Sequence, residues 1–438
     1  MSRNALYNPA CEALPRDELE QLQIERLQST LNRVYRSVAF YRTAFDANCV
    51  NLEKIRDLRA MRDLPFTTRD DLLRSYPYDM FAVPLRDIVR IHQGFAIAGT
   101  PVVVGYTRND LRNWTECAAR VLTAGGITEH DVVQIALDYG LLPGAPGFQQ
   151  GAELIGASVI PASMTASMSR QIAIMKDFKT TALITTPSHA LNIAAGLEEM
   201  GVHPERLQLR LALFGGERWS DELQKRIEEK LHVIAIDTYG LTAIMGPGVA
   251  GECRQRCGLH INEDHFIVEV IDPTSLEPLG PGCEGELVLT TITKEGFPLI
   301  RYRTGDITSV NSEPCACGRT LARMTRVSRR TDDLIFFHGV GFFPVQIEKI
   351  LYEVEGLSPH YQIILDRQGD VDTLEIKVEV LEDIPSLDEI KTLEILRNQV
   401  ARRIKTVLNL DAKVTFAEPK SLRSDSGAIP RVLDRRPG

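Results

Sequence analysis

LALFGGERWSDELQKRIEEKLHVIAIDTYGLTAIMGPGVAGEC, residues 211–253, holds the pattern that decides the fold. Leu211–Phe214 and Val233–Ile236 are short, uninterrupted apolar runs, which are typical of strands buried on both faces. Between them, Asp221–Leu231 has the composition of a helix. Two buried strands joined by a helix make one unit of a parallel sheet. The stretch therefore predicts an α/β fold.

The same alternation begins near residue 110. Val132–Leu137 and Ala182–Ile184 are further buried-strand candidates, so we expect a parallel sheet with helices on its faces. Nearer the N-terminus, residues 17–45 predict an amphipathic helix, because apolar residues recur there at spacings of three and four. These residues are Leu27, Leu31, Val34, Val38 and Tyr41.

After residue 262 the pattern changes. Strand-like Phe266–Ile271 and Glu286–Leu289 flank proline- and glycine-rich turns, which indicates a hairpin-rich β section. The charged stretch Arg329–Asp333 suits a hinge, and the remaining residues predict strands with a long helix, Leu387–Leu408. We therefore expect a large N-terminal domain (1–328) with mixed and parallel sheets and a β-rich part, a hinge (329–333) and a small α+β C-terminal domain (334–438).

The composition and net charge of the chain limit the kinds of partner that it can bind. The chain has 438 residues, 44% of them hydrophobic, and a net charge of −9, which disfavours nucleic acid or an anionic membrane as the main partner. The N-terminus lacks the apolar core of a signal peptide, and no apolar run reaches the roughly 18 residues that a membrane span needs. We expect a cytoplasmic protein without a membrane partner. Its eight cysteines would then be reduced thiols unless they bind metal.

Two short clusters contain potential metal ligands. Cys253, Cys257 and His260 lie close together in the sequence, and Cys315 and Cys317 form a CxC pair further along. Zinc prefers four thiolate or imidazole ligands, and a closed shell of four leaves no open position for catalysis. The spacing predicts a structural zinc site. The alternative is four reduced cysteines in a turn-rich region.

Several segments resemble the phenylacetate–coenzyme A ligase family of the adenylate-forming superfamily. They keep the family's order and cover nearly the whole chain. The matching segments are DYGLLPGAPGFQQGAELIGA (138–157), LFGGERWS (213–220), DTYGLTAIMGPGVAGEC (237–253), GLHINEDHFIVEVIDP (258–273), GELVLTTITKEGFPLIRYRTGDIT (285–308), PCACGRT (314–320), RRTDDLIFFHGVGFFPVQIE (329–348) and RVLDRR (431–436).

The resemblance implies a two-step reaction on a small aryl or acyl acid. The carboxylate attacks the α-phosphate of ATP to give an acyl-adenylate, and coenzyme A then displaces AMP. A large domain binds the substrates, and a small domain rotates over it between the steps. The resemblance also implies a possible homodimer through the N-terminal helices. Its metal ligands are Cys253, His260, Cys315 and Cys317, with Cys257 as the alternative to His260.

The resemblance assigns roles to the positions that match. Asp306 would hold the ribose hydroxyls, as a carboxylate accepts O–H donors well. The walls of the nucleotide site would be Gly215, Gly216, Glu217, Tyr239 and Gly240. The substrate pocket would use Tyr139, Phe148 and Tyr239, and the hinge would use Arg330 and Asp332. The alternatives are plain tight turns for the glycines, a capping role for Asp306 and a core role for Phe148.

Three positions depart from the family pattern. Thr100 stands where the phosphate loop ends in lysine, and Ala243 stands where a glutamate helps to hold magnesium. Ala428 stands where a C-terminal lysine reaches the reacting phosphate, and Lys420 lies eight positions too early. Triphosphate binding depends on backbone N–H groups and a cation, and a methyl group cannot ligate magnesium. We expect impaired adenylation without productive use of Mg-ATP, while AMP or coenzyme A still binds.

The hinge also departs from the pattern. Arg329 replaces a glycine, and a residue with a Cβ has fewer allowed backbone conformations, so rotation of the small domain is restricted.

Three hypotheses of function remain open at this point. The first is an enzyme of ligase descent that uses its pocket for other chemistry on an aryl acid or a thioester. The second is a working ATP-dependent ligase with compensating residues. The third is a pseudoenzyme that only binds a ligand. A nucleophile beside a base would favour an enzyme, and Ser188–His189 is the nearest candidate, although a polar helix start explains this pair better.

Overall fold

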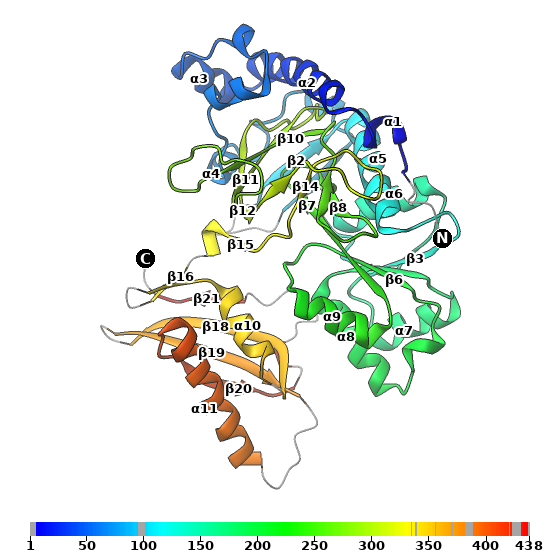
Figure 1. The fold of residues 1–438 in the computed structure, drawn as a ribbon, viewed down its shortest axis with the longest axis vertical. Coiled ribbons are helices and arrows are strands. Elements are labelled where there is room, and N and C mark those ends of the chain that lie inside the picture. The colour runs from blue at the N-terminus through cyan, green and yellow to red at the C-terminus, as the bar shows by residue number, and fades with distance from the viewer. Residues whose placement is uncertain are drawn as a thin grey trace. The chain divides into compact units, whose positions relative to one another are not determined.

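The computed structural model describes residues 6–94, 101–333, 335–337, 340–354, 356–368, 371–381, 389–419, 421–422 and 431–436. The chain divides into two compact units, Met1–Ser328 and Arg329–Gly438. Figure 1 shows the elements of both units.

A nine-stranded sheet forms the centre of the large unit. Five of its strands are parallel and lie in the order β4–β3–β5–β6–β7. Their bounds are β3 (Val132–Ile135), β4 (Ser158–Pro161), β5 (Ala182–Thr185), β6 (Leu211–Phe214) and β7 (Ile234–Leu241). Antiparallel strands continue the sheet beyond β7, namely β8 (Gly246–Glu252), β9 (Leu259–Ile261), β14 (Arg323–Met324) and β13 (Val310–Asn311).

Helices cover both faces of this sheet (Figure 1). One face carries α5 (Arg108–Gly125) and α6 (Gly144–Ile155), which pack closely against each other. The other face carries α7 (Met168–Asp177), α8 (Pro187–Glu199) and α9 (Asp221–Leu231). Every residue of β5 and β6 is buried, as the apolar runs predict. The expected α/β architecture is confirmed.

The β-rich part of the large unit is also present. Antiparallel strands β10 (Phe266–Ile271), β11 (Gly285–Thr291) and β12 (Tyr302–Thr308) lie side by side. A separate hairpin pairs β1 (Arg90–Gln93) with β2 (Val103–Tyr106). Residues 95–100, which join the two strands of this hairpin and include Thr100, lie outside the described residues.

The N-terminal helical segment differs from the single helix expected. It forms α1 (Pro9–Glu12), α2 (Arg16–Ser37) and α3 (Ala39–Ala47), followed by α4 (Arg69–Arg74). The break falls at Val38, whose backbone is extended with φ −114° and ψ 110°. No proline or glycine marks this break, and all five apolar residues of the predicted stripe are buried. The chain bends there so that both helices keep their apolar faces in one core. Short 3₁₀ helices span Leu52–Lys54, Leu58–Asp63, Leu85–Asp87 and Pro204–Arg206.

The small unit has a core of its own. Its four-stranded sheet has the order β20–β19–β18–β21. The helices α10 and α11 contact each other and the sheet (Figure 1). The bounds are β15 (Arg329–Arg330), a 3₁₀ turn (Thr331–Asp333), β16 (Ile335–Phe337), β17 (Val340–Phe342), α10 (Pro344–Tyr352), β18 (Leu357–Gln368), β19 (Val371–Val380), α11 (Glu389–Leu408), β20 (Lys413–Ala417) and β21 (Val432–Asp434). This is the small α+β unit that the sequence predicts.

Among the residues described, no helix combines the length and the apolar character needed to cross a lipid bilayer.

Candidate functional site

The predicted site residues follow the carboxyl ends of the parallel strands. Tyr139 comes after β3, Ser188 after β5 and Gly215–Glu217 after β6, while Tyr239 and Gly240 lie near the carboxyl end of β7. Parallel neighbours place their carboxyl ends at the same edge of a sheet, and open α/β sheets bind ligands at that edge. The fold therefore brings residues from four separate segments to one edge.

Gly215 lies against the aromatic side chain of Phe148. A Cβ at Gly215 would lie 2.7 Å from Thr238 Oγ1 and 3.9 Å from Phe148 Cζ. A side chain at residue 215 would therefore clash with the end of β7. Gly216 has a φ of +81° in open space, so its need for glycine comes from the backbone alone.

Gly240 cannot be replaced by a larger residue, because the neighbouring strand of its hairpin lies too close. A Cβ there would collide with Gly246 O, on the neighbouring strand β8. Close packing explains Gly215 and Gly240 without a ligand, so the tight-turn alternative holds for them equally well.

Tyr139 and Phe148 belong to the same apolar cluster. Phe148 is buried on α6, and Tyr139 packs against the cluster from the loop after β3. The hydroxyl of Tyr139 is buried and has no hydrogen-bond partner among the described residues. Burial raises the pKa of Tyr139 to about 12. This hydroxyl is therefore a neutral donor with capacity for a polar ligand atom.

Glu217 joins two of the site loops. Its carboxylate accepts hydrogen bonds from Ser188 N at 3.1 Å and from Ser188 Oγ at 2.7 Å. Ser188 lies in the first turn of α8, where backbone N–H groups and the helix dipole favour a negative charge. The carboxylate thus fixes the loop after β6 to the start of α8.

Ser188 and His189 do not form a nucleophile–base pair. The hydroxyl of Ser188 contacts Glu217 and Thr186, and Nε2 of His189 has no partner in the part of the chain that is described. Desolvation lowers the pKa of His189 to about 4, so the imidazole is neutral near pH 7. The geometry supports the polar helix start and gives no dyad.

Tyr239 and Asp306 are hydrogen-bonded across two sheets. The hydroxyl of Tyr239, in β7, donates to Asp306 Oδ2 at 2.6 Å, and Asp306 lies in β12. The Asp306 side chain is largely buried, and Thr304 Oγ1 accepts a hydrogen bond from its backbone N–H. Two residues expected at the nucleotide are therefore in direct contact.

Ala243 lies in the loop that joins β7 to β8. It is 8% exposed and packs in the main core of the large unit. The adjacent carbonyl of Ile244 accepts a hydrogen bond of 2.6 Å from Nζ of Lys294. Tyr106 and Trp114 donate to further carbonyls of this segment, those of Met245 and Pro247. Three buried donors thus hold this loop in place, and the Ala243 side chain itself is a methyl group that cannot bind a cation.

Lys294 is a buried cation that the sequence patterns did not single out. Its ammonium group lies 4.4 Å from the ring centroid of Tyr106. Burial lowers the pKa of Lys294 to about 7. In the sequence, Lys294 is a lysine between the apolar strands β11 and β12. A lysine in such a position is usually exposed, so nothing indicated that this one is buried.

The other two departures, Thr100 and Ala428, lie outside the described residues. At the expected hinge, Arg330 lies in β15 and residue 332 in the turn Thr331–Asp333. The boundary between the compact units falls after Ser328, next to these residues.

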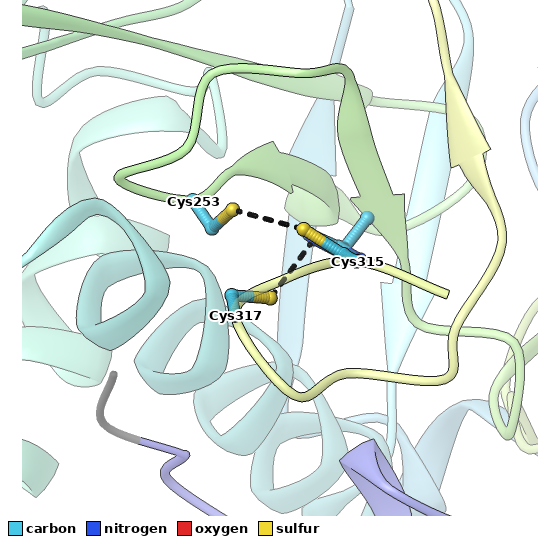
Figure 2. A group of neighbouring side chains, drawn as sticks. Cys253, Cys315 and Cys317 are labelled. Carbon is cyan, nitrogen blue, oxygen red and sulfur yellow. Dashed lines mark hydrogen bonds between the residues drawn. The ribbon is translucent and has the colours of Figure 1, made fainter. Parts of the chain in front are cut away.

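Four of the five predicted metal ligands form a buried cluster. The ligand atoms of Cys253, His260, Cys315 and Cys317 all lie within 4.8 Å of one another. Figure 2 shows the three thiols pointing toward a common centre. Cys253 follows β8, His260 lies in β9, and the CxC pair follows β13. The fold thus joins two ligand clusters that are far apart in the sequence.

The spacing of these atoms fits a tetrahedral ion. Cys253 Sγ lies 3.8 Å from Cys315 Sγ, and Cys317 Sγ lies 3.4 Å from His260 Nε2. With Zn–S bonds of about 2.3 Å, two sulfurs of a tetrahedron are about 3.8 Å apart. His260 Nδ1 faces Leu321 O at 3.3 Å, a contact that orients the ring with Nε2 toward the thiols. This cluster can hold a metal ion.

Cys257 lies next to the cluster. Its Sγ is 3.5 Å from Cys315 Sγ, but the residue is exposed, whereas the four clustered residues are buried. Arg323 donates to Cys257 Sγ at 2.8 Å. His260 therefore completes the group of four in this geometry, and Cys257 is an adjacent fifth donor.

The CxC loop is also fastened to the N-terminal helix, a contact that the sequence patterns did not reveal. Nε of Arg319 donates to Glu12 Oε2 at 2.6 Å, and both side chains are buried. Thr320 donates to the carbonyls of Glu12 and Leu14. The loop that carries two residues of the cluster is thus held against α1.

Two family models match the chain. The AMP-binding enzyme family matches residues 103–293, and the C-terminal domain of AMP-binding enzymes matches residues 339–436. Similar curated proteins include a phenylacetate–coenzyme A ligase of Thermus thermophilus, which is 41% identical over 98% of this chain and 100% of its own length. A protein of the same name from Escherichia coli is 40% identical over 96% of this chain and 95% of its own.

Solved structures agree on the fold. A 2-hydroxyisobutyryl-CoA ligase in the postadenylation state, in complex with 2-HIB-AMP, has a TM-score of 0.87 and 25% identity, with 98% of this chain and 92% of that one covered. An anthranilate CoA ligase bound to anthranoyl-AMP has a TM-score of 0.56 at 16% identity over 76% of this chain and 63% of its own, and supports the fold alone. These matches do not reveal a loss of adenylation. By fold and by similarity along almost its whole length, the chain belongs to the phenylacetate–coenzyme A ligase family of AMP-binding, adenylate-forming proteins.

Proposed function

We propose that this protein is an aryl acid–coenzyme A ligase that works through an acyl-adenylate. The proposal rests mainly on the similarity to curated phenylacetate–coenzyme A ligases. Four of these proteins are 38–41% identical to this chain over 96–99% of its length. An aromatic acid such as phenylacetate is the substrate class, and ATP and coenzyme A are the co-substrates.

The site residues have separate roles in this proposal. Phe148 and Tyr139 contact the aromatic ring of the acid, and Gly215 lets the acyl group approach the backbone. Tyr239 and Asp306 hold the nucleoside as a hydrogen-bonded pair, with Gly216, Glu217 and Gly240 in the adjacent loops. Arg330 and Asp332 serve the hinge. The proximity of Gly215 to Phe148 and the hydrogen bond between Tyr239 and Asp306 support this arrangement.

The two half-reactions depend on different groups. Thr100, Ala243 and Ala428 stand where the family's groups act on the triphosphate and its magnesium, so their replacement affects adenylation first. Loss of one preorganised electrostatic group typically costs about 10²–10³ in rate. We therefore expect pyrophosphate release to be the slow half of the reaction and thioester formation to be the fast half.

A second candidate function is favoured by Ala243. Its methyl group packs in the core, and no carboxylate is supplied at this position. In this case the protein would bind an aryl acid, an adenylate or a thioester without making the adenylate itself, as a repurposed enzyme or as a binding protein.

One pair of reactions separates the candidates. The protein is supplied with aromatic acid, Mg-ATP and coenzyme A, and in parallel with a preformed acyl-adenylate and coenzyme A. A ligase yields the thioester in both. Thioester from the preformed adenylate alone favours the second candidate, and no thioester in either reaction contradicts both enzymatic proposals.

We propose further that the Cys253, His260, Cys315 and Cys317 cluster binds zinc in a structural role. Three thiolates and one imidazole are ligands that zinc prefers, and a closed four-ligand shell offers no position to a substrate. Metal analysis of the purified protein tests this, with about one zinc per chain expected.

A further inference from the structure

A fourth thiol, that of Cys257, lies beside the metal cluster and has no role in the proposed reaction. Cys257 lies on the turn between β8 and β9, where Arg256 has a φ of +51° and Gly258 a φ of +109°. This tight turn brings Cys257 Sγ to 3.5 Å from Cys315 Sγ. Cys257 also borders a cavity of about 730 Å³, so solvent and small solutes reach it.

Arg323 holds the Cys257 thiol in this position. Its Nη1 atom donates to Cys257 Sγ and to Cys257 O, both at 2.8 Å. Arg323 itself lies in β14, directly opposite His260 of β9. The guanidinium therefore ties the exposed thiol to the same strand pair that carries a metal ligand.

We propose that Cys257 is an oxidation site, at which a peroxide converts Cys257 and Cys315 into a disulfide that opens the metal cluster. This inference rests on the proposed metal site but is independent of the ligase reaction. Cys315 is the partner because its sulfur is the one in reach, and a disulfide needs the two sulfurs at about 2.05 Å. A shift of about 1.5 Å between the sulfurs is small enough for side-chain rotation.

The chemistry balances with one peroxide. The Cys257 thiol attacks a peroxide oxygen, the O–O bond breaks, and a sulfenic acid and water are formed. The sulfur of Cys315 then displaces the sulfenic oxygen as a second water, and the S–S bond forms. Two thiols lose two electrons, and hydrogen peroxide gains two.

The product has one metal ligand fewer. Cys253, His260 and Cys317 alone cannot complete a tetrahedral shell, so the ion is bound more weakly and leaves. The CxC loop is then no longer anchored by the metal ion, although the Arg319–Glu12 salt bridge still joins it to α1. Oxidation therefore loosens the CxC loop, which contacts α1 through Arg319 and Glu12.

The experiment treats the full-length, zinc-loaded protein with hydrogen peroxide. A chromogenic chelator reports zinc release, and peptide mass spectrometry identifies the disulfide. Zinc release from Cys257→Ser should be at least about tenfold slower than from the unchanged protein, since oxidation selects the exposed thiol. Cys49→Ser removes another exposed thiol and should behave as the unchanged protein. Arg323→Gln keeps both thiols and should lower the yield of the disulfide.

Each other outcome overturns a defined part of the proposal. Equal zinc release from Cys257→Ser overturns Cys257 as the oxidation site, and so does a disulfide that excludes Cys257. A reduced Cys257→Ser protein that is folded by circular dichroism but purifies without zinc makes Cys257 a ligand instead. If the unchanged protein holds no zinc, the metal proposal fails, and the disulfide is still decided by mass. Ligase activity is measured separately, because the oxidation site stands or falls on zinc release and the disulfide alone.

Discussion

At the scale of single residues, Ala243 poses the sharpest chemical question. The loop around it is held by three buried donors from Lys294, Tyr106 and Trp114, so its backbone is fixed in place. Residue 243 lacks only the carboxylate of the family pattern, and a single substitution can supply it. A change of side chain is therefore the natural test of the slow half-reaction.

Thr100→Lys, Ala243→Glu and Ala428→Lys together should raise the rate of pyrophosphate release by about 10² or more, because they supply a cation and a magnesium ligand. The increase need not be the sum of three single changes, since such groups act together. Pyrophosphate release with a fixed aromatic acid is the measurement. The matched control carries Ala243→Gln in place of glutamate. An equal gain in that control would show that the carboxylate is not the missing part.

The buried imidazole of His189 makes a prediction about acid stability. Its folded-state pKa of about 4 lies below the ordinary value near 6.5, so between these values the unfolded chain binds a proton that the folded chain does not. Stability therefore falls as the pH drops from 6.5 to 4, by up to about 1.4 kcal/mol per pH unit for this group. In His189→Gln this contribution to the slope should vanish, as measured by urea unfolding at several pH values. His232→Gln, at an exposed site, should keep the slope of the unchanged protein, and an unchanged slope in His189→Gln would contradict the account.

At the scale of elements, the sequence predicted regular segments better than contacts between segments. The helix Asp221–Leu231 and the strands Leu211–Phe214 and Phe266–Ile271 have the predicted bounds, because local apolar patterns determine them. The break at Val38 was missed, since burial on both sides produces it and no local signal marks it. The salt bridge between Glu12 and Arg319 was also missed, because its partners are 307 residues apart.

The candidate site shows the same division. Residue types and spacing were enough to select the residues that form the buried Cys253, His260, Cys315 and Cys317 cluster, since two short clusters of thiols are rare. They could not separate Cys257 from His260, because that choice depends on which side chain a turn directs inward. The sequence likewise could not predict that the Tyr139 hydroxyl lacks a hydrogen-bond partner among the described residues, or that Lys294 is buried, because both depend on tertiary packing.

If the cluster binds zinc, loss of one ligand should affect both the zinc content and the stability of the large unit. Cys317→Ser removes a buried ligand, so the protein should lose its zinc and melt at a lower temperature. The shift should be about 1–2 °C for each kcal/mol lost, because the unfolding entropy of so large a unit is high. Differential scanning calorimetry and metal analysis measure both effects. Cys283→Ser, at an exposed position, should change neither. Full zinc content in Cys317→Ser would rule out the proposed shell.

At the scale of the whole molecule, the two units have separate cores, and the metal cluster lies in the large one. Calorimetry should therefore resolve two transitions. Removal of zinc with a chelator should lower only the transition of the large unit, and a separate chain of residues 329–438 should identify the other transition. A common shift of both transitions would contradict independent units.

The proposed ligase reaction of the complete chain is tested by its product. The purified protein is mixed with phenylacetate and related aromatic acids, Mg-ATP and coenzyme A, and the thioester is quantified by mass spectrometry. We predict an acyl-CoA product whose formation needs ATP and becomes faster when a preformed acyl-adenylate replaces acid and ATP. The absence of thioester from the mixture of acid, Mg-ATP and coenzyme A, with protein that is folded and zinc-loaded, would contradict the ligase reaction.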